Sequence, residues 1–458
     1  MQLIFRQFLS RINNEAAEVL EDISEMNNYE IMYQKKLTAL ESIAGMVEPG
    51  WNCCADNGIA IPFAMFGAIG ERVRRDELEG ITMQSFFDVC AMPCYDSVLS
   101  KKINGISWFS SSGGRKAINT GNADVMPNYY RDAPLLYREY IDIDAFCTVV
   151  SPMDKHGYFS TCNSSCSFAQ SRKAKRIFLE VNENLPRSPS SSFIHISQVT
   201  ALCENHIPIP TIAPAEEDSI CTRIGELIAD EIPDEATIQL GIGTIPNAVG
   251  MMLRNKRNLG IHSEMFTDSM VELLECGAAN NEKKPIHTGR SVATFAFGGK
   301  RMYDFINDNP SIEMLPVDYV NDPAVISKHP NMMSVNAAVE VDFMGQVCAE
   351  SIGSRHISGT GGQVDFVRGA IQSVGGKSFI AFTSTTGNGE CSRICPVLKS
   401  GAFVTTSKND VDYIVTEYGI IKLRGKSVYQ RAKALISIAH PKFRDELTYQ
   451  ARELNITI

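Results

Sequence analysis

The sequence predicts an α/β protein built from two open domains with mainly parallel sheets. Short apolar runs alternate with helical patterns along most of the chain. Uninterrupted apolar strands that alternate with helices are typical of parallel sheets covered on both faces. A stretch near the middle of the chain, residues 204–219, concentrates three prolines and several acids and separates two such series. We therefore expect two α/β domains joined by a linker.

Length and composition are compatible with this class. The 458 residues could form between two and four domains at roughly 100–200 residues each, and we prefer two. A hydrophobic content of 44% and a charged content of 21% are typical of a soluble globular protein. The formal charge of −10 repels nucleic acid and anionic membranes, and no apolar run approaches the ~18 residues of a membrane span. We expect neither nucleic acid nor membrane as a partner, and an anionic ligand must be held by local features.

The cysteines favour a reducing compartment. There are 13 of them, an odd number, and no secretory signal precedes them. The pairs Cys90/Cys94, Cys162/Cys166 and Cys391/Cys395 could in principle ligate a metal, but the eight histidines are dispersed. We expect reduced thiols, no metal and a cytoplasmic location.

The chain divides into an N-terminal extension, residues 1–32, and two domains, residues 33–210 and 217–458. The extension reads as helical, with a transit peptide as the alternative. In the first domain we expect strands at 144–150 and 176–181. In the second we expect them at 236–243, 291–299, 377–385 and 412–419. The two domains could be distant structural duplicates.

The first candidate binding element follows the strand at the start of the second domain. Gly241 and Gly243 permit a tight turn, and Pro246 falls in the first turn of the next helix. Such a turn can present N–H groups and a positive helix end to an oxygen anion. The alternative is a plain strand-to-helix turn, since a Gly-x-Gly without a correctly placed third glycine is a weak dinucleotide fingerprint.

The second element, "NLGIHSEMFTD" (258–268), leaves a carboxylate in a loop. Ser269 and Glu272 have the spacing of a capping box, so we expect a helix from about Ser269 and Glu264 in the loop before it. That loop follows the carboxyl end of a strand, where open α/β sheets bind ligands. The alternatives are a solvated loop glutamate and, for His262, a structural residue of the sheet rather than a base.

The third element combines a polar strand residue with a glycine-rich loop. Asn336 lies within the apolar run 334–350 and requires a hydrogen-bonding partner. Gly359, Gly361 and Gly362 could form an anion-binding loop. We expect Asp365 and Arg368, three residues apart, to brace the following helix.

In this order, "QLGIGTIPNAVG", "GIHSEMFTD", "SVNAAVEVDFMGQV" and "ISGTGGQVDFVRGA" resemble the acetyl-CoA hydrolase/transferase family, nearest to butyryl-CoA:acetate and 4-hydroxybutyrate CoA-transferases. The resemblance extends from about residue 33 to the end and implies a cleft between two CoA-transferase-type domains. It implies that Glu264 is the covalent nucleophile. It also implies CoA-binding and oxyanion roles for the turn Gly241, Ile242, Gly243, Thr244 and Ile245, for Asn336, and for Gly359, Gly361 and Gly362.

The function implied is CoA transfer between a short-chain acyl-CoA, butyryl- or 4-hydroxybutyryl-CoA, and acetate. A carboxylate with an ordinary pKa of ~4.3 is ionised at neutral pH and attacks a thioester without a general base. The reaction would be ping-pong, through a glutamyl-CoA thioester. The resemblance implies coenzyme A as substrate and covalent intermediate, no tightly bound cofactor, and a homodimer or larger assembly.

Three alternatives stay open at this point. An acyl-CoA hydrolase would use the same scaffold with water as acceptor. A dinucleotide-dependent oxidoreductase would use "GIGTIP", although its third glycine is missing and its ribose-binding acid would have to be Glu264. A non-catalytic sensor would bind CoA without becoming acylated.

Overall fold

The computed structural model describes residues 27–189, 192–213 and 218–456, so most of the predicted extension lies outside the described residues. Helix α2 (Asn28–Lys36) runs across the predicted boundary after residue 32. The Tyr33 ring stacks on Phe159 with centroids 6.2 Å apart, and its hydroxyl donates to Glu204 Oε1 at 2.6 Å. Residues on both sides of that boundary therefore belong to one helix that packs on the first half of the chain.

The first half folds around a seven-stranded sheet whose strand pairs are all parallel. Its order is β4 (Asp124–Val125), β3 (Ile103–Phe109), β2 (Ile81–Phe86), β1 (Asn52–Asn57), β5 (Ala145–Val150), β7 (Arg176–Val181) and β9 (Ala201–Glu204). The strands predicted at 144–150 and 176–181 are β5 and β7.

Both faces of this sheet are buried, as its apolar strands require. Cys53 and Ala55 of β1 pack in one apolar cluster with α3 (Leu40–Gly45) and α4 (Phe63–Arg74). Cys54, between them, packs in another with α6 (Ala133–Glu139) and α7 (Ser167–Lys173). Successive strand residues point to opposite faces, so a strand between two helical layers is apolar at every position.

The second half contains a six-stranded sheet that is parallel except at one edge. Its order is β11 (Gly260–Ile261), β10 (Thr237–Leu240), β16 (Met332–Ala337), β21 (Lys377–Ala381), β23 (Tyr413–Thr416) and β24 (Gly419–Lys422). Only the β23–β24 pair is antiparallel among these strands. Two short parallel pairs extend the β11 side: β12 (Met265–Phe266) with β14 (Phe295–Ala296), and β13 (Ser291–Ala293) with β15 (Ile312–Met314).

Helices and a smaller sheet complete the second half. The smaller sheet joins β17 (Glu340–Asp342), β18 (Val347–Cys348) and β22 (Ile394–Cys395). The principal helices are α8 (Ser219–Glu231), α9 (Thr244–Met252), α10 (Asp268–Glu275), α11 (Lys300–Ile306), α12 (Val317–Val320), α13 (Pro323–Ile326), α14 (Gln363–Gln372), α15 (Val428–Ser437) and α16 (Pro441–Glu453). α10 begins one residue before Ser269, but its N-cap is Thr267 and no side chain caps it, so the predicted capping box is wrong.

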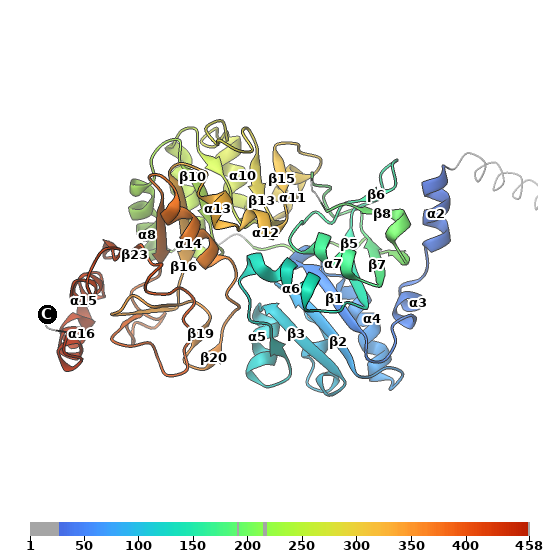
Figure 1. Cartoon of the computed structure of the whole chain (residues 1–458), viewed down its shortest axis with the longest axis horizontal. Coiled ribbons are helices and arrows are strands. Elements are labelled where there is room, and N and C mark those ends of the chain that lie inside the picture. Colours follow the sequence, from blue (N-terminus) through green and yellow to red (C-terminus); the bar gives the residue numbers. More distant parts are fainter. Residues whose placement is uncertain (1–26, 190–191, 214–217, 457–458) are drawn as a thin grey trace, which may run out of the picture.

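The two halves lie side by side (Figure 1). Buried apolar side chains of both halves belong to one continuous core. A loop of the first half, residues 160–166, reaches into the second: Ser165 N–H donates to Thr294 O at 3.1 Å, and Asn163 Oδ1 accepts from Ala296 N at 3.2 Å. Further along, Tyr130 N–H donates to Gly361 O at 3.2 Å. These backbone contacts fix the carboxyl ends of the two sheets opposite each other.

The predicted α/β class with mainly parallel sheets is confirmed. No described helix has the length and apolarity that crossing a bilayer requires. All 13 cysteines are free thiols. Within the described ranges, no three His, Cys, Asp or Glu side chains come together in a way that could hold a metal ion.

Candidate active site

A pocket lies between the halves and is lined by the carboxyl ends of strands from both sheets. From the first half come Asn57 at the end of β1, Phe86 and Phe87 at the end of β2, and Trp108 and Phe109 at the end of β3. The remaining lining residues are Asn128 and Tyr130 from the first half and Ile242, Glu264, Phe295 and Gly361 from the second. Parallel strands end at one edge of their sheet, so the fold itself gathers these side chains.

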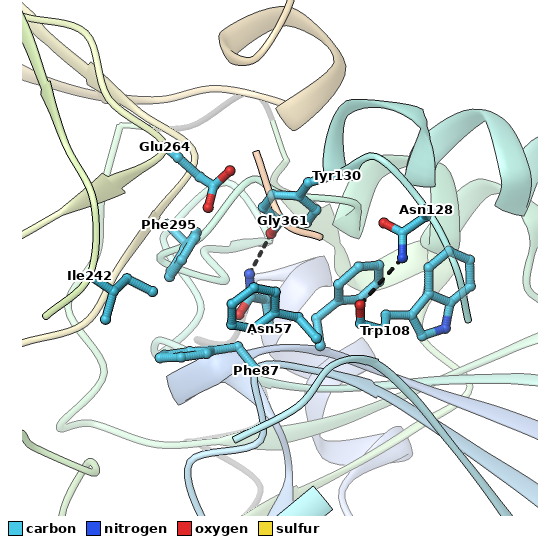
Figure 2. A pocket seen from close by; sticks show the side chains of 11 residues that line it. Asn57, Phe87, Trp108, Asn128, Tyr130, Ile242, Glu264, Phe295 and Gly361 are labelled. Carbon is cyan, nitrogen blue, oxygen red and sulfur yellow. Dashed lines mark hydrogen bonds between the residues drawn. The ribbon is translucent and has the colours of Figure 1, made fainter. Parts of the chain in front are cut away.

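Glu264 lies in the short loop between β11 and β12, and its carboxylate faces the pocket (Figure 2). Two N–H donors hold the carboxylate: Asn321 Nδ2 at 2.7 Å from Oε2, and the Gly362 backbone N–H. Asn321 is completely buried at the end of α12, and Gly362 is the N-cap of α14. The carboxylate is therefore positioned by two separate helices.

Burial raises the pKa of Glu264 from 4.5 to about 7, although the hydrogen bonds from Asn321 and Gly362 oppose the rise. An apolar surrounding disfavours the charged form, whereas donors to the carboxylate favour it. The expectation of an ordinary pKa was wrong. At neutral pH the carboxyl group is only partly ionised, and the anion that exists is poorly hydrated and correspondingly reactive.

The glycine-rich loop before α14 is shaped by close approaches. A Cβ at Gly359 would lie 2.7 Å from Trp108 O, and a Cβ at Gly361, whose φ is +60°, would lie 3.0 Å from the Phe109 ring. A Cβ at Gly362 would overlap the Glu264 carboxylate. Gly359 and Gly361 thus let the loop pack on the first half, and Gly362 brings a backbone donor to Glu264.

The turn after β10 lies at the rim of the pocket. Ile242 lines the pocket and is 38% exposed, and Gly243 has a φ of +122° that favours glycine. Gly243 and Thr244 are also exposed, Gly241 is half-buried, and Ile245 is buried in the first turn of α9. The exposed backbone of this turn is accessible to a ligand that extends out of the pocket.

Asn336 lies at the end of β16, next to the same turn. Its Nδ2 donates to Gln239 Oε1 at 3.1 Å and to Ser334 Oγ at 3.0 Å. A Cβ at Gly241 would lie 3.4 Å from its Oδ1. The amide is therefore paired with neighbouring strand residues and supports the turn from behind.

His262 is structural in its contacts. It is fully buried, and its Nε2 donates to Val320 O at 2.8 Å, since a carbonyl can only accept. Its other ring nitrogen lies 3.3 Å from His329 Nε2. Burial, the first of several causes, lowers its pKa well below 6.5, so His262 is neutral and holds the end of α12 that precedes Asn321.

The first half contributes an aromatic wall, defined as Phe86, Phe87, Trp108, Phe109 and Tyr130. Phe87 has a φ of +46°, which is unusual for a bulky side chain. Its ring lies 5.9 Å from Phe295 and 5.4 Å from Phe297, centroid to centroid, across the pocket. Strained backbone of this kind concentrates at ligand sites, and here it directs the ring against the second half.

A polar atom that this half contributes to the lining of the pocket has no hydrogen-bond partner among the described residues. Asn57 is 2% exposed, and its Nδ2 donates to the hydroxyls of Tyr130 and Ser165. Its Oδ1 is buried without a hydrogen bond in the described structure. Because the residue lines the pocket (Figure 2), this oxygen is an acceptor that a ligand hydroxyl could satisfy.

Sequence reasoning missed every residue that the first half contributes to the pocket, and it also missed the site role of three polar residues around Glu264. Asn321 follows an apolar segment that lies outside the motifs quoted above, and its Nδ2 donates to Glu264 Oε2. Asp365, expected to brace its helix with Arg368, instead has its Oδ2 3.5 Å from Asn321 Nδ2, while Arg368 pairs with Asp410 at 3.0 Å. Arg131 of the first half lies 3.7 Å from Asp365. Among these three residues, only Asp365 has a signal in the sequence. It follows the glycine loop closely, at the start of a helix that faces the pocket.

The chain matches two family models. Residues 22–213 match the acetyl-CoA hydrolase/transferase N-terminal domain, and residues 298–451 match the acetyl-CoA hydrolase/transferase C-terminal domain. The predicted family resemblance is thereby confirmed.

Curated relatives are similar over nearly their whole length. The succinyl-CoA:cyclohexane-1-carboxylate CoA transferase of Geobacter metallireducens is 46% identical, covering 93% of this chain and 98% of the relative. The 4-hydroxybutyrate coenzyme A transferase of Clostridium kluyveri is 42% identical, covering 92% and 98%. Acetyl-CoA hydrolases are more distant: that of Candida albicans is 27% identical over 52% of this chain.

A solved structure has the same fold. RipA from Yersinia pestis superposes with a TM-score of 0.89 at 37% identity, covering 94% of this chain and all of RipA.

Proposed function

We propose that this chain, which belongs to the acetyl-CoA hydrolase/transferase family and is a CoA-transferase, moves CoA from a short-chain acyl-CoA to acetate. The observation that carries the proposal is the half-buried Glu264 carboxylate, held by two N–H donors in an apolar pocket between two α/β halves. A desolvated carboxylate beside preorganised donors has the properties of a nucleophile for acyl transfer.

The chemistry needs only that carboxylate. Ionised Glu264 attacks the thioester carbonyl, which forms an acyl-glutamyl anhydride and releases CoA thiolate. The thiolate attacks the glutamyl carbonyl, which releases the first carboxylic acid as its anion and leaves a glutamyl-CoA thioester. Acetate then reverses both steps and departs as acetyl-CoA, so one thioester replaces another and no net proton is consumed.

The two donors would stabilise the charge that develops. When the thiolate attacks, the glutamyl carbonyl oxygen becomes an oxyanion at the position where Asn321 Nδ2 and the Gly362 N–H already converge. A preorganised donor of this kind contributes about 3–4 kcal/mol to such a step. We assign the oxyanion role to these two groups, and contact with CoA to the turn 241–245, which is exposed at residues 242–244, to Asn336 next to that turn, and to the loop of Gly359.

The aromatic wall favours a short apolar acyl chain. Five aromatic side chains form that side of the pocket, and the Asn57 Oδ1 is the unpaired acceptor among them. A butyryl chain would pack on the rings, and the terminal hydroxyl of a 4-hydroxybutyryl chain could donate to Asn57. Comparing the two acyl-CoAs with wild type and Asn57→Ala tests this assignment: loss of the Nδ2 bonds to Tyr130 and Ser165 should affect both substrates, whereas loss of the acceptor should weaken the hydroxylated substrate further.

The principal alternative, an acyl-CoA hydrolase, requires water at the anhydride or thioester. The aromatic wall and the backbone contacts between the halves oppose access of water. Release of free thiol should therefore be slow without acetate and should not rise when acetate is added, whereas acetyl-CoA should accumulate. Fast thiol release without acetate would favour the hydrolase.

The other two alternatives are less compatible with the site. A ribose-binding acid must face a dinucleotide, but Glu264 faces an apolar pocket and is bonded to Asn321. A sensor would bind CoA and never be acylated. The predicted homodimer or larger assembly and the cytoplasmic location stay predictions.

The decisive experiment detects the covalent intermediate. The enzyme is incubated with butyryl-CoA, reduced with borohydride and digested, and the peptide that contains Glu264 is analysed by mass spectrometry. Wild type should carry the reduced residue, and Glu264→Gln should carry none and lack activity. Glu180→Gln is the matched control, since Glu180 is buried in β7 but bonded to Asn205 away from the pocket. Full activity of a folded Glu264→Gln enzyme would refute the proposal.

A further inference from the structure

Asp365 lies in the first turn of α14, with its carboxyl group buried beside that of Glu264. The residue is 2% exposed. Asn321 Nδ2 lies 2.7 Å from Glu264 Oε2 and 3.5 Å from Asp365 Oδ2. A single amide group therefore connects the two carboxyl groups, one of which is the proposed nucleophile.

The orientation of this amide follows from its two neighbours. An ionised carboxylate only accepts hydrogen bonds, and a protonated carboxyl group keeps an acceptor oxygen, so both groups can accept from the NH₂ end of the Asn321 side chain. The other end, Oδ1, is buried without a partner, which costs about 1–3 kcal/mol. Asn321 keeps this costly orientation because the two carboxyl groups on its other side require a donor.

The backbone of Asn321 is fixed as well. Its N–H donates to Val317 O at 2.9 Å, and the preceding carbonyl, of Val320, accepts from His262. Only the side-chain rotation of Asn321 stays adjustable. A change at Asp365 would therefore alter the direction in which the Asn321 amide points, and through that amide the position of the Glu264 carboxylate.

The charges around the pair are unbalanced. Arg131 is the cation nearest to Asp365, 3.7 Å away, and it is 38% exposed and also contacts Asp132 and Asp322. Arg368, one turn further along α14, is paired with Asp410. With one buried and one half-buried carboxyl group close together and one shared, partly solvated guanidinium, a state in which both carboxyl groups are ionised is unfavourable.

We propose, resting on the function proposed above, that Asp365 is a positioning residue that stays protonated in the working enzyme and, through Asn321, aims the Glu264 carboxylate at the thioester. A protonated Asp365 still accepts a hydrogen bond from Asn321 Nδ2 and adds no second negative charge. An ionised Asp365 would compete with Glu264 for the amide and repel it.

The titration of the pair supports this assignment. Burial raises the pKa of Asp365 from 3.8 to about 8; the charge of Glu264 adds to the rise, and Arg131 opposes it. Burial raises the pKa of Glu264 to about 7. Glu264 Oε2 receives Asn321 Nδ2 at 2.7 Å and Glu264 also receives the Gly362 N–H, whereas Asp365 Oδ2 lies 3.5 Å from the same amide, so the pair ionises first at Glu264 and keeps its proton on Asp365. Above about pH 8 the second charge appears, and the rate should fall.

The test is the pH profile of kcat/KM for butyryl-CoA in wild type and Asp365→Asn, since this parameter reports the free enzyme. Asparagine has nearly the same shape as protonated aspartic acid and cannot ionise. Wild type should lose activity below about pH 7 and again above about pH 8. Asp365→Asn should keep near wild-type activity at pH 7 and the acidic limb, and should lack the alkaline limb.

Two further variants separate positioning from general stability. Asp365→Ala should lose about 10- to 100-fold in kcat with little change in KM, because Asn321 is no longer oriented, and Asp365→Asn should restore that loss. Asp322→Asn is the matched control: Asp322 contacts the same Arg131 at 3.6 Å but lies in a different position, at the N-cap of α13. Its profile should keep both limbs.

Three results would overturn the proposal: an alkaline limb that persists in Asp365→Asn, wild-type kcat in Asp365→Ala, or a large loss at every pH in a folded Asp365→Asn. Folding is checked by thermal unfolding; Asp365→Asn should unfold at a higher temperature than wild type, increasingly so as the pH approaches 8, because it removes a buried carboxyl group whose ionisation is unfavourable. Failure of the proposed function itself is distinguishable, since wild type would then lack the borohydride-trapped adduct at Glu264.

Discussion

The two sides of the pocket differ in chemistry although both are built from the carboxyl ends of parallel strands. The first half presents the aromatic wall and the amide side chains of Asn57 and Asn128. The second half presents Glu264, with Asn321, Asp365 and the Gly362 N–H behind it. Under the proposed function, one half would select the acyl group while the other would hold the charges that react.

The same architecture therefore produces opposite environments. At the end of β2 the chain places Phe87 and desolvates the pocket, and at the end of β11 it places a carboxylate into that desolvated space. Both halves contribute to the raised pKa of Glu264, because the aromatic wall of the first half helps to exclude water from a carboxylate of the second half. Changes on either side can test this division of labour.

The strongest expected effect is on the reactive side. Glu264→Asp shortens the side chain by one methylene and withdraws the carboxylate from Asn321, Gly362 and the substrate, so kcat should fall about 100-fold or more. Initial rates of acetyl-CoA formation from butyryl-CoA and acetate measure the loss. Glu272→Asp, on the neighbouring α10, should keep wild-type rates. Rates of Glu264→Asp equal to those of wild type would contradict the proposal that the reaction requires the carboxylate at this position.

The next effect concerns the aromatic wall. Phe87→Ala removes a ring that faces Phe295 across the pocket, so the ratio of kcat/KM for hexanoyl-CoA to that for butyryl-CoA should rise by about 10-fold or more. Competition between the two acyl-CoAs measures this ratio directly. Phe168→Ala, which removes an exposed ring on α7, is the control and should leave the ratio unchanged. If Phe87→Ala left the ratio of kcat/KM for hexanoyl-CoA to butyryl-CoA unchanged, the proposed role of the first half in acyl selection would be wrong.

A smaller effect links the two sides through pH. Rate depends on ionised Glu264, so with a pKa of about 7 the value of kcat/KM for butyryl-CoA should fall about tenfold between pH 8 and pH 6 in a variant without the alkaline limb, Asp365→Asn. Stopped-flow or initial-rate assays in constant ionic strength measure the limb. A midpoint near 4.5 would show that the aromatic wall does not desolvate the nucleophile.

The smallest effect is on stability. The pKa of Glu264 is higher in the folded than in the unfolded chain, so its ionisation destabilises the fold as pH rises from about 4.5 through about 7. Glu264→Gln should therefore be more stable than wild type, by about 1–3 kcal/mol at pH 8 and by less at pH 5. Thermal unfolding at both pH values measures this, with Glu272→Gln as the control. Equal stability at pH 8 would indicate a solvated carboxylate.

The pattern of apolar strands was sufficient to predict the α/β class and the position of Glu264 after a strand, because those features depend on local periodicity. It was not sufficient to predict Asn321 or Arg131, since they reach the site only through contacts between segments far apart in the chain. Asp365 illustrates the limit. Its spacing from Arg368 indicated a helix brace, but the closer partners are an amide 44 residues away and an arginine of the other half.

The pKa of Glu264 could not be predicted for the same reason. It depends on burial by side chains such as Phe295 and on the Gly362 N–H, and neither adjoins residue 264 in the chain. The glycines of residues 359–362 were recognisable as a flexible loop, but the steric need for each became visible only against Trp108, Phe109 and Glu264.

The loop at residues 160–166 donates from its backbone to Thr294 O and accepts at Asn163 Oδ1 from the backbone of Ala296 in β14. This arrangement has a consequence for chimeras made from members of the family. Main-chain contacts to Thr294 and Ala296 do not depend on the identity of those side chains. A chimera that exchanges the first half for that of a relative could thus seat correctly and inherit the donor's acyl preference, while the recipient keeps its own reactive carboxylate.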